Sequence, residues 1–84
     1  MYKIEIYPDA RMHAKTLTPR VQAAFAEATS VLELVPWNGE PYNKDKPEGN
    51  IRQLVFGPNG EGILTYMILE DQQRVDVLQV QWID

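Results

Sequence analysis

The chain contains no cysteine and only one histidine among its 84 residues. Without cysteine there is no disulfide, and a structural zinc site would lack most of its ligands. His13 follows Asp9 by four residues, and two such ligands make a poor metal site. Ser30 has no second histidine to activate it, so a Ser-His-Asp triad has no support beyond composition. We therefore expect no metal and no cofactor.

The chain also lacks any run of about 18 apolar residues that could span a bilayer, so no membrane role is expected. Its first ten residues have neither the basic start nor the apolar middle of a secretory signal. Together with the missing cysteines, this predicts a cytoplasmic protein. The net charge is −4, which argues against a surface built throughout for phosphate backbones, although the first twenty residues are locally basic.

A chain of 84 residues supports one hydrophobic core, so residues 1–84 are predicted to form a single domain. Residues 2–7 alternate apolar and polar side chains as a half-buried strand does. A short helix is expected over residues 10–17. Thr18 and Pro19 then offer an N-cap and a first helical residue, and apolar residues at helical spacing continue to Val35.

Residues 36–50 contain three prolines and two glycines and are expected to form a long surface loop that carries Trp37 and Tyr42. The sequence leaves open whether these two aromatic residues cover a sheet edge or bind a partner. Three strand-like segments follow, at residues 51–56, 62–70 and 74–82. The middle one is apolar on both faces and should be central. The apolar phase of the last one shifts by one residue, which predicts a β-bulge.

The segment FGPNGEG, residues 56–62, could be read as a phosphate-binding loop or as a turn. A phosphate loop needs a helix after the glycines, usually with a lysine, whereas a strand follows Gly62. Pro58 and Asn59-Gly60 are typical turn residues. We therefore expect a hairpin here, and a second hairpin turn at EDQQR, residues 70–74.

Two sets of charged residues could carry chemistry. Glu70 and Asp71 fall in the second hairpin turn, where acidic residues are common because they are solvated. Arg52 alternates onto the same strand face as Leu54 and Phe56 and could clamp a phosphate or a partner's carboxylate. Alternatively, it is a strand-end cation that pairs with an acidic residue, Glu61 or Asp76.

The order of one strand, two helices and three strands, together with the motifs of its second half, resembles the RelE/ParE superfamily of bacterial toxins from type II toxin-antitoxin modules. The resemblance covers essentially the whole chain. Its strongest part is the run of a strand with an early arginine, a Gly-rich turn and a strand with a late tyrosine, here residues 51–56, 57–62 and 63–66. It implies an α+β fold, β-α-α-β-β-β, in which an antiparallel sheet is covered on one face by two helices.

The resemblance also implies a function and a site. Arg52 and Tyr66 match the catalytic positions of the family, and Lys3 or Lys46 would assist them. The implied partners are a cognate antitoxin and the ribosome with its mRNA. Ribonuclease members carry an arginine three residues before the tyrosine, where this chain has Ile63, and their catalytic tail beyond the last strand has no counterpart before Asp84. Isoleucine cannot stabilise a phosphate, and the pI is acidic, near 4.8.

We therefore predict a toxin-like component of a type II toxin-antitoxin module with weak or lost ribosome-dependent mRNA endonuclease activity. The alternative is a non-catalytic binding protein of the same fold that acts through a protein partner. An unrelated α+β interaction module is the third hypothesis. The residues leave open whether the chain is an enzyme.

Overall fold

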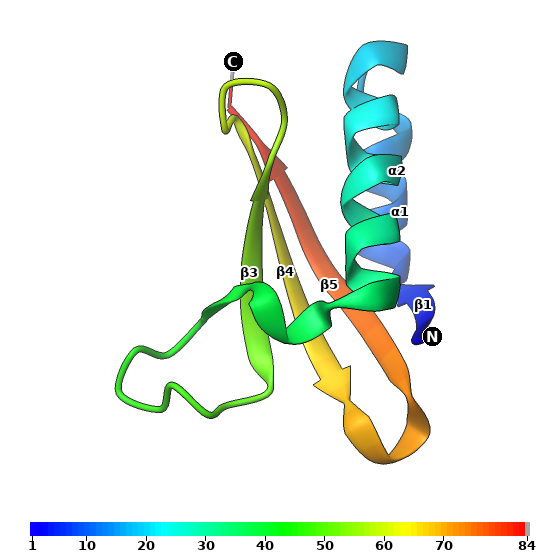
Figure 1. Ribbon diagram of the computed structural model, residues 1–84. Helices are drawn as coiled ribbons and strands as arrows, with labels where there is room; N and C mark the ends of the chain where they lie inside the picture. Colours follow the sequence, from blue (N-terminus) through cyan, green and yellow to red (C-terminus); the bar gives the residue numbers. More distant parts are fainter. Residues whose placement is uncertain (84) are drawn as a thin grey trace.

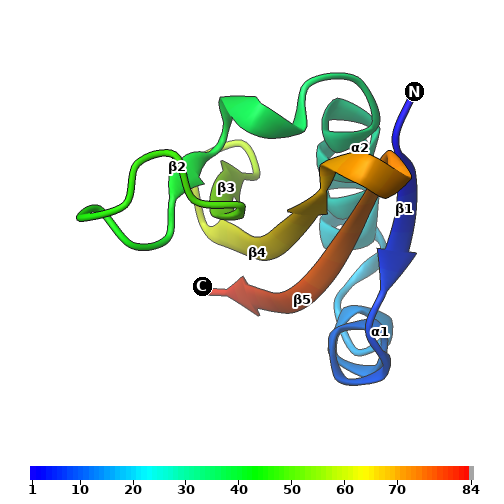
Figure 2. The same ribbon diagram turned by 90° about the horizontal axis from the view of Figure 1, so that it is seen from below.

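The computed structural model describes residues 1–83. Its elements follow the predicted order (Figure 1), with one short additional strand in the loop region (Figure 2). They are β1 Lys3–Ile6, α1 Pro8–Lys15, α2 Pro19–Leu34, the 3₁₀ turn η1 Pro36–Asn38, β2 Glu40–Pro41, β3 Ile51–Phe56, β4 Gly62–Leu69, the 3₁₀ turn η2 Glu70–Gln72 and β5 Arg74–Trp82.

The strands form one five-stranded sheet in the order β1-β5-β4-β3-β2. The three long strands β3, β4 and β5 pair antiparallel, and β4 is central, as predicted. The sheet as a whole is mixed rather than antiparallel, because β1 runs parallel to its neighbour β5. Alternation predicts a strand but not its direction, and the two helices between β1 and the rest provide the long crossover that a parallel pair needs.

Both helices lie on one side of the twisted sheet, so the fold is α+β with one covered and one open face (Figures 1 and 2). Apolar side chains of α2 and of the three central strands meet in the core. The largest fully buried side chains from these elements are Leu32, Leu64, Tyr66, Ile68, Val75 and Val77. Thr18 caps α2 through its hydroxyl, which accepts a hydrogen bond from the Val21 N–H. The predicted long helix is confirmed.

The predicted turns and the predicted bulge are also confirmed. Gly57 and Gly60 adopt φ of 97° and 74° in the β3–β4 turn, a region that glycine enters without strain. In β5, Leu78 is the extra residue of a bulge, because Thr65 pairs with Gln79 while Tyr66 pairs with Val77. Among the described residues, no helix is both long and apolar enough to cross a membrane.

Candidate functional site

Arg52 lies on β3, and its guanidinium points into the loop that precedes this strand. Nε donates to the Gly49 carbonyl at 3.1 Å, and Nη2 donates to the Pro47 carbonyl at 2.6 Å. Nη1 is shared between the carbonyls of Trp37, at 3.2 Å, and Gly39, at 3.1 Å. The same guanidinium stacks 4.9 Å from the centroid of the Trp37 ring. Arg52 thus holds both ends of the 36–50 segment with a single side chain.

Tyr66 lies directly opposite Arg52 on the neighbouring strand β4. Its ring is fully buried, and its hydroxyl donates to the Pro36 carbonyl at 2.6 Å. Gly39 packs so closely on this hydroxyl that a Cβ at that position would collide with it. Burial raises the pKa of Tyr66 to about 12, against the opposing effect of the Arg52 charge. The tyrosine is therefore neutral near pH 7 and is a poor general base there.

The structure thus brings together the two predicted catalytic residues, on the covered face of the sheet. Arg52 forms no ion pair with either of the carboxylates suggested by the sequence, because Asp76 pairs with Arg74 instead. Lys3 lies on β1, three strands away from β3, a distance of about 14 Å. Lys46 is in the loop that Arg52 closes. The catalytic assignment of Arg52 and Tyr66 stays a prediction, and their observed contacts are those of residues that fix a loop.

Glu70 is the centre of a polar network that the sequence did not reveal. Its Oε1 accepts hydrogen bonds from Trp37 Nε1 at 2.8 Å and from the Tyr2 hydroxyl at 2.7 Å. Its Oε2 accepts one from Gln73 Nε2 at 2.8 Å. The hydrogen bond from Trp37, followed by those from Tyr2 and Gln73, lowers the pKa of this carboxyl. Glu70 thereby connects the base of the loop to the N-terminus and to the β4–β5 turn.

This network predicts a pH-dependent contribution to stability. The pKa of Glu70 is lower in the folded chain than in the unfolded chain, where it is about 4.5. The stabilisation is therefore complete above that pH and is lost as the pH falls through the lower, folded value. We expect Glu70→Gln to flatten the fall in melting temperature below about pH 4.5. Asp71→Asn is the matched control, since no described residue donates a hydrogen bond to its side chain, and an equal effect of both variants would contradict the network.

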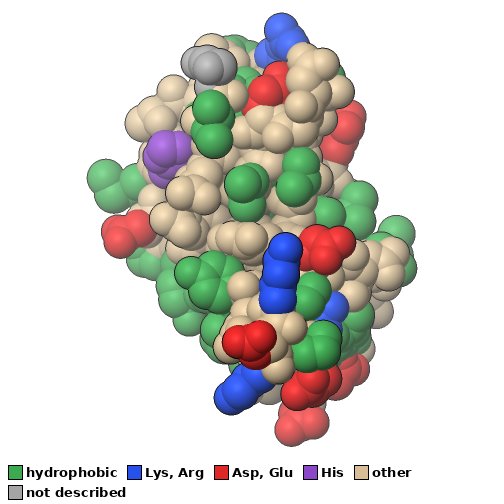
Figure 3. Space-filling model, turned by 90° about the vertical axis from the view of Figure 1, so that its left-hand side faces the viewer, with side chains coloured by type: hydrophobic (Ala, Val, Ile, Leu, Met, Phe, Trp, Pro, Cys, Tyr) green, Lys and Arg blue, Asp and Glu red, His purple; other side chains and the backbone are tan. Residues whose placement is uncertain are grey.

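The open face of the sheet is the face that the two helices leave uncovered (Figures 1 and 2). Figure 3 shows this side, where the part over the strands carries mainly apolar and uncharged polar side chains, without a cluster of Lys or Arg. A groove of about 400 Å³ lies on it. It is lined by Asp9, Tyr42, Ile51, Thr65, Leu78 and Gln79. Tyr42 is 60% exposed, so its ring is available to a partner, whereas Trp37 is held by Glu70 and Arg52.

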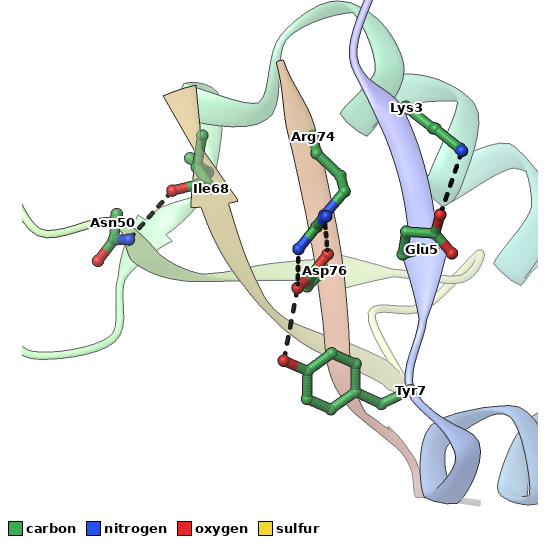
Figure 4. A network of polar contacts seen from close by, with 7 residues as sticks. All are labelled: Lys3, Glu5, Tyr7, Asn50, Ile68, Arg74 and Asp76. Carbon is green, nitrogen blue, oxygen red and sulfur yellow. Dashed lines mark hydrogen bonds and ion pairs between the residues drawn. The ribbon is translucent and has the colours of Figure 1, made fainter. Parts of the chain in front are cut away.

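Two cations of the strands, Lys3 and Arg74, stand on this open face, and both are already paired (Figure 4). Arg74 binds Asp76 through two hydrogen bonds, of 2.9 Å and 3.3 Å. The Tyr7 hydroxyl donates to the same carboxylate at 3.4 Å. Lys3 pairs with Glu5 at 3.4 Å. Asp76 is only 3% exposed, so its charge depends on Arg74 for compensation.

Removing the Asp76 carboxylate should destabilise the fold. Asp76→Ala leaves the half-buried Arg74 guanidinium without its partner, and we expect a loss of about 2 kcal/mol in the free energy of unfolding. Urea unfolding measures this loss. Glu5→Ala is the control, since its ion pair with Lys3 is exposed and should contribute less than about 1 kcal/mol. Equal stability of wild type and Asp76→Ala would show that the buried pair is not stabilising.

The electrostatics of the open face are therefore balanced rather than positive. Among residues 1–83, no group of three or more acidic or histidine side chains could hold a metal ion. Stabilising a developing phosphate charge needs preorganised donors that are free to turn toward it. Arg52 uses its donors on the covered face, and the strand cations of the open face use theirs on carboxylates.

No protein-family model and no curated protein sequence matches this chain significantly. Solved structures do match along its whole length. A chain of the toxin-antitoxin complex RelBE2 from Mycobacterium tuberculosis aligns with a TM-score of 0.81 and 25% identity, covering 98% of both chains. The isolated RelE toxin of E. coli aligns with a TM-score of 0.80 and 12% identity, covering 100% of this chain and 86% of the toxin. A chain of the archaeal RelE-RelB complex from Pyrococcus horikoshii aligns with a TM-score of 0.66 and 13% identity, covering 96% of this chain and 93% of that one.

Proposed function

From the RelE-like fold of this chain, we propose that it is the toxin component of a toxin-antitoxin module and acts through protein binding, with weak or no cleavage of mRNA. The observation that carries the proposal is the likeness to RelBE2 at 25% identity over 98% of both chains, since that structure is a toxin-antitoxin complex. The proposed partner is an antitoxin, and the proposed location is the cytoplasm.

Weak or absent cleavage is proposed on the charges described above. The likeness extends through β3, β4 and β5, yet the position where ribonuclease members carry an arginine holds Ile63. The cations on the strands of the open face are neutralised by neighbouring carboxylates. Binding to a protein does not need these donors to be free, because apolar area and shape supply most of its energy.

Binding is tested with the purified chain and the protein encoded by the adjacent reading frame. We expect the two to co-purify and the melting temperature of the chain to rise with partner concentration, as mass action requires. A protein from an unrelated toxin-antitoxin module of similar net charge is the control. If the neighbouring protein neither co-purifies nor shifts the melting temperature, the proposed module membership is wrong.

A second candidate is residual ribosome-dependent cleavage of mRNA with Arg52 and Tyr66 as catalytic residues. The observation in its favour is the strand register, which sets these two side chains opposite each other. In this candidate the hydrogen bonds of Arg52 to the loop would have to open before its guanidinium could reach a phosphate. The two candidates therefore differ in what Arg52 does in the resting protein.

A further inference from the structure

The groove on the open face of the sheet is shaped by the irregularity in β5. Asp9, from the first turn of α1, lines it beside β5, and Tyr42 lines it beyond β3, at the opposite edge of the sheet. Leu78 and Gln79 both line it, although consecutive residues of a regular strand point to opposite faces. The bulge at Leu78 explains this, because an extra residue changes the direction of the side chains around it. The bulge therefore adds a second side chain of β5 to this open-face groove.

The open-face groove has the length of a short extended peptide. It runs from β5 across β4 and β3 to the β2 edge, which is three strand spacings of about 4.8 Å, or about 14 Å in total. An extended chain spans about 3.4 Å per residue, so four or five residues fit along it. A smaller hollow of about 180 Å³ adjoins one end and shares Asp9, Leu78 and Gln79 with the groove. This hollow can take a side chain of such a peptide.

The polar side chains of the groove suit a peptide backbone. Gln53 Nε2 donates to the Thr65 hydroxyl at 3.3 Å, so the hydroxyl proton is available to a carbonyl of a ligand. Gln79 is exposed, and its amide can both donate and accept. A peptide backbone likewise donates and accepts, whereas a phosphodiester only accepts. The exposed ring of Tyr42 adds an aromatic surface against which an apolar side chain can pack.

The charges around the groove indicate the sign of its occupant. Asp9 is the only charged residue that lines it, and Glu40 stands on the same face of the sheet, because it pairs in register with Gln53. Neither carboxylate forms a hydrogen bond or an ion pair with any of residues 1–83. No lysine or arginine lines the groove or the adjoining hollow, and this includes Lys44 and Lys46 of the nearby loop. In a chain of net charge −4, such a surface attracts a cation and repels both a phosphate backbone and a second copy of the chain.

We propose that the open-face groove is the docking site for an extended basic segment of the protein on which this toxin acts. A lysine or arginine of the segment lies against Asp9, and apolar side chains pack on Ile51 and Tyr42. The backbone of the segment forms hydrogen bonds with Thr65 and Gln79. The inference rests on the proposed function and adds to it the surface that binds the target and the chemical class of the target segment.

The test measures the binding of synthetic peptides to the full chain by nuclear magnetic resonance. The peptides have six residues and capped, uncharged ends, and they are made in pairs that differ only in having lysine or glutamate at one position. The other positions combine leucine, serine and tyrosine. We expect at least one lysine peptide to shift the backbone amide signals of Tyr42, Thr65 and Gln79. Its glutamate twin should bind at least about fivefold more weakly, because it loses an exposed ion pair and gains a repulsion.

Variants of the groove locate the contacts. Asp9→Asn should weaken binding of the lysine peptide about fivefold and reduce the effect of salt on its affinity. Tyr42→Ala should weaken it about tenfold, whereas Tyr42→Phe keeps the ring and should stay within about twofold of wild type. Glu27→Gln is the matched control for Asp9→Asn, since Glu27 is an exposed carboxylate of α2 that does not line the groove, and it should leave the affinity unchanged. The amide spectrum of each variant verifies its folding.

The outcomes separate this inference from the proposed function. If no lysine peptide binds, or if the glutamate twins bind equally well, the inference is wrong, while module membership still stands on the binding of the neighbouring protein. If the lysine peptides bind as expected and the neighbouring protein does not, the groove is a peptide site and the proposed function fails.

Two further results would overturn the inference by identifying another occupant. In the first, a uridine hexanucleotide shifts the same amide signals and binds Asp9→Asn more tightly than wild type, so that the groove takes RNA. In the second, the chain self-associates through these amides and Tyr42→Ala weakens the association, so that the occupant is a second copy of the chain.

Discussion

Arg52→Ala is expected to lower the free energy of unfolding by about 2–4 kcal/mol, because one guanidinium makes four charged hydrogen bonds to loop carbonyls. The Trp37 ring also loses the cation that stacks on it. Urea unfolding gives the magnitude. The loop should loosen as well, so trypsin should cut after Lys44 faster than in wild type under native conditions.

Two control variants make this result interpretable. Arg52→Lys keeps the charge but lacks the planar fork, so it should recover only a small part of the lost stability. Arg11→Ala removes an exposed arginine of α1 whose guanidinium forms no hydrogen bond with any of residues 1–83, and it should change stability by less than about 0.5 kcal/mol. If Arg52 served only to bind a phosphate, its replacement would leave the stability and the trypsin cleavage of the loop unchanged. Wild-type stability and unchanged trypsin cleavage in Arg52→Ala would show that Arg52 does not hold the 36–50 loop in place.

Tyr66→Ala is expected to have the larger effect, about 3–5 kcal/mol, because it empties a fully buried ring position in the core. A domain of this size has a total stability of roughly 4–13 kcal/mol, so this loss removes a large part of it and should lower the melting temperature by at least about 12 °C. Thermal unfolding followed by circular dichroism checks this. The chain would lose the core contact through which α2 and the sheet hold the 36–50 segment.

Tyr66→Phe isolates the hydroxyl from the ring. It should cost about 1–3 kcal/mol, since the buried Pro36 carbonyl loses its hydrogen-bond donor. The loss does not come from poorer packing of the core, because the phenylalanine ring fits within the volume that tyrosine occupies. A stability equal to wild type would mean that the hydroxyl is not needed for the fold. That result would favour the catalytic role that the second candidate function gives to Tyr66.

The strands and helices could be predicted because their signals are local. Segments rich in Val, Ile, Leu and aromatic residues between turn signals gave β3, β4 and β5. The phase shift in the last strand gave the bulge at Leu78, and Thr18 with Pro19 gave the start of α2. The direction of β1 could not be predicted, because it depends on how the crossover through two helices closes. β2 escaped prediction because it consists of only two residues, one of them Pro41, within an irregular segment.

The candidate site could be predicted only in part. Alternation already placed Arg52 on the face of Leu54 and Phe56, which is the covered face. What its guanidinium meets there depends on the path of the loop, and that path is set by distant contacts such as that of Asn50 with Ile68 on β4. The same holds for Glu70, whose donors come from residues 2 and 37. The pairs on the open face had a local signal, because Arg74 and Asp76 are two residues apart in one strand, as are Lys3 and Glu5.

The most direct test of the proposed function is an assay for cleavage of mRNA on programmed ribosomes by the purified chain, at concentrations up to that of the ribosomes. We expect at most weak cleavage, unchanged in a folded Arg52→Lys variant, from a sample whose folding is verified by circular dichroism and which binds the neighbouring protein. Cleavage by wild type that disappears in a folded Arg52→Lys variant would contradict it. In that case Arg52 would be a catalytic residue, and its hydrogen bonds to the loop would form only in the resting protein.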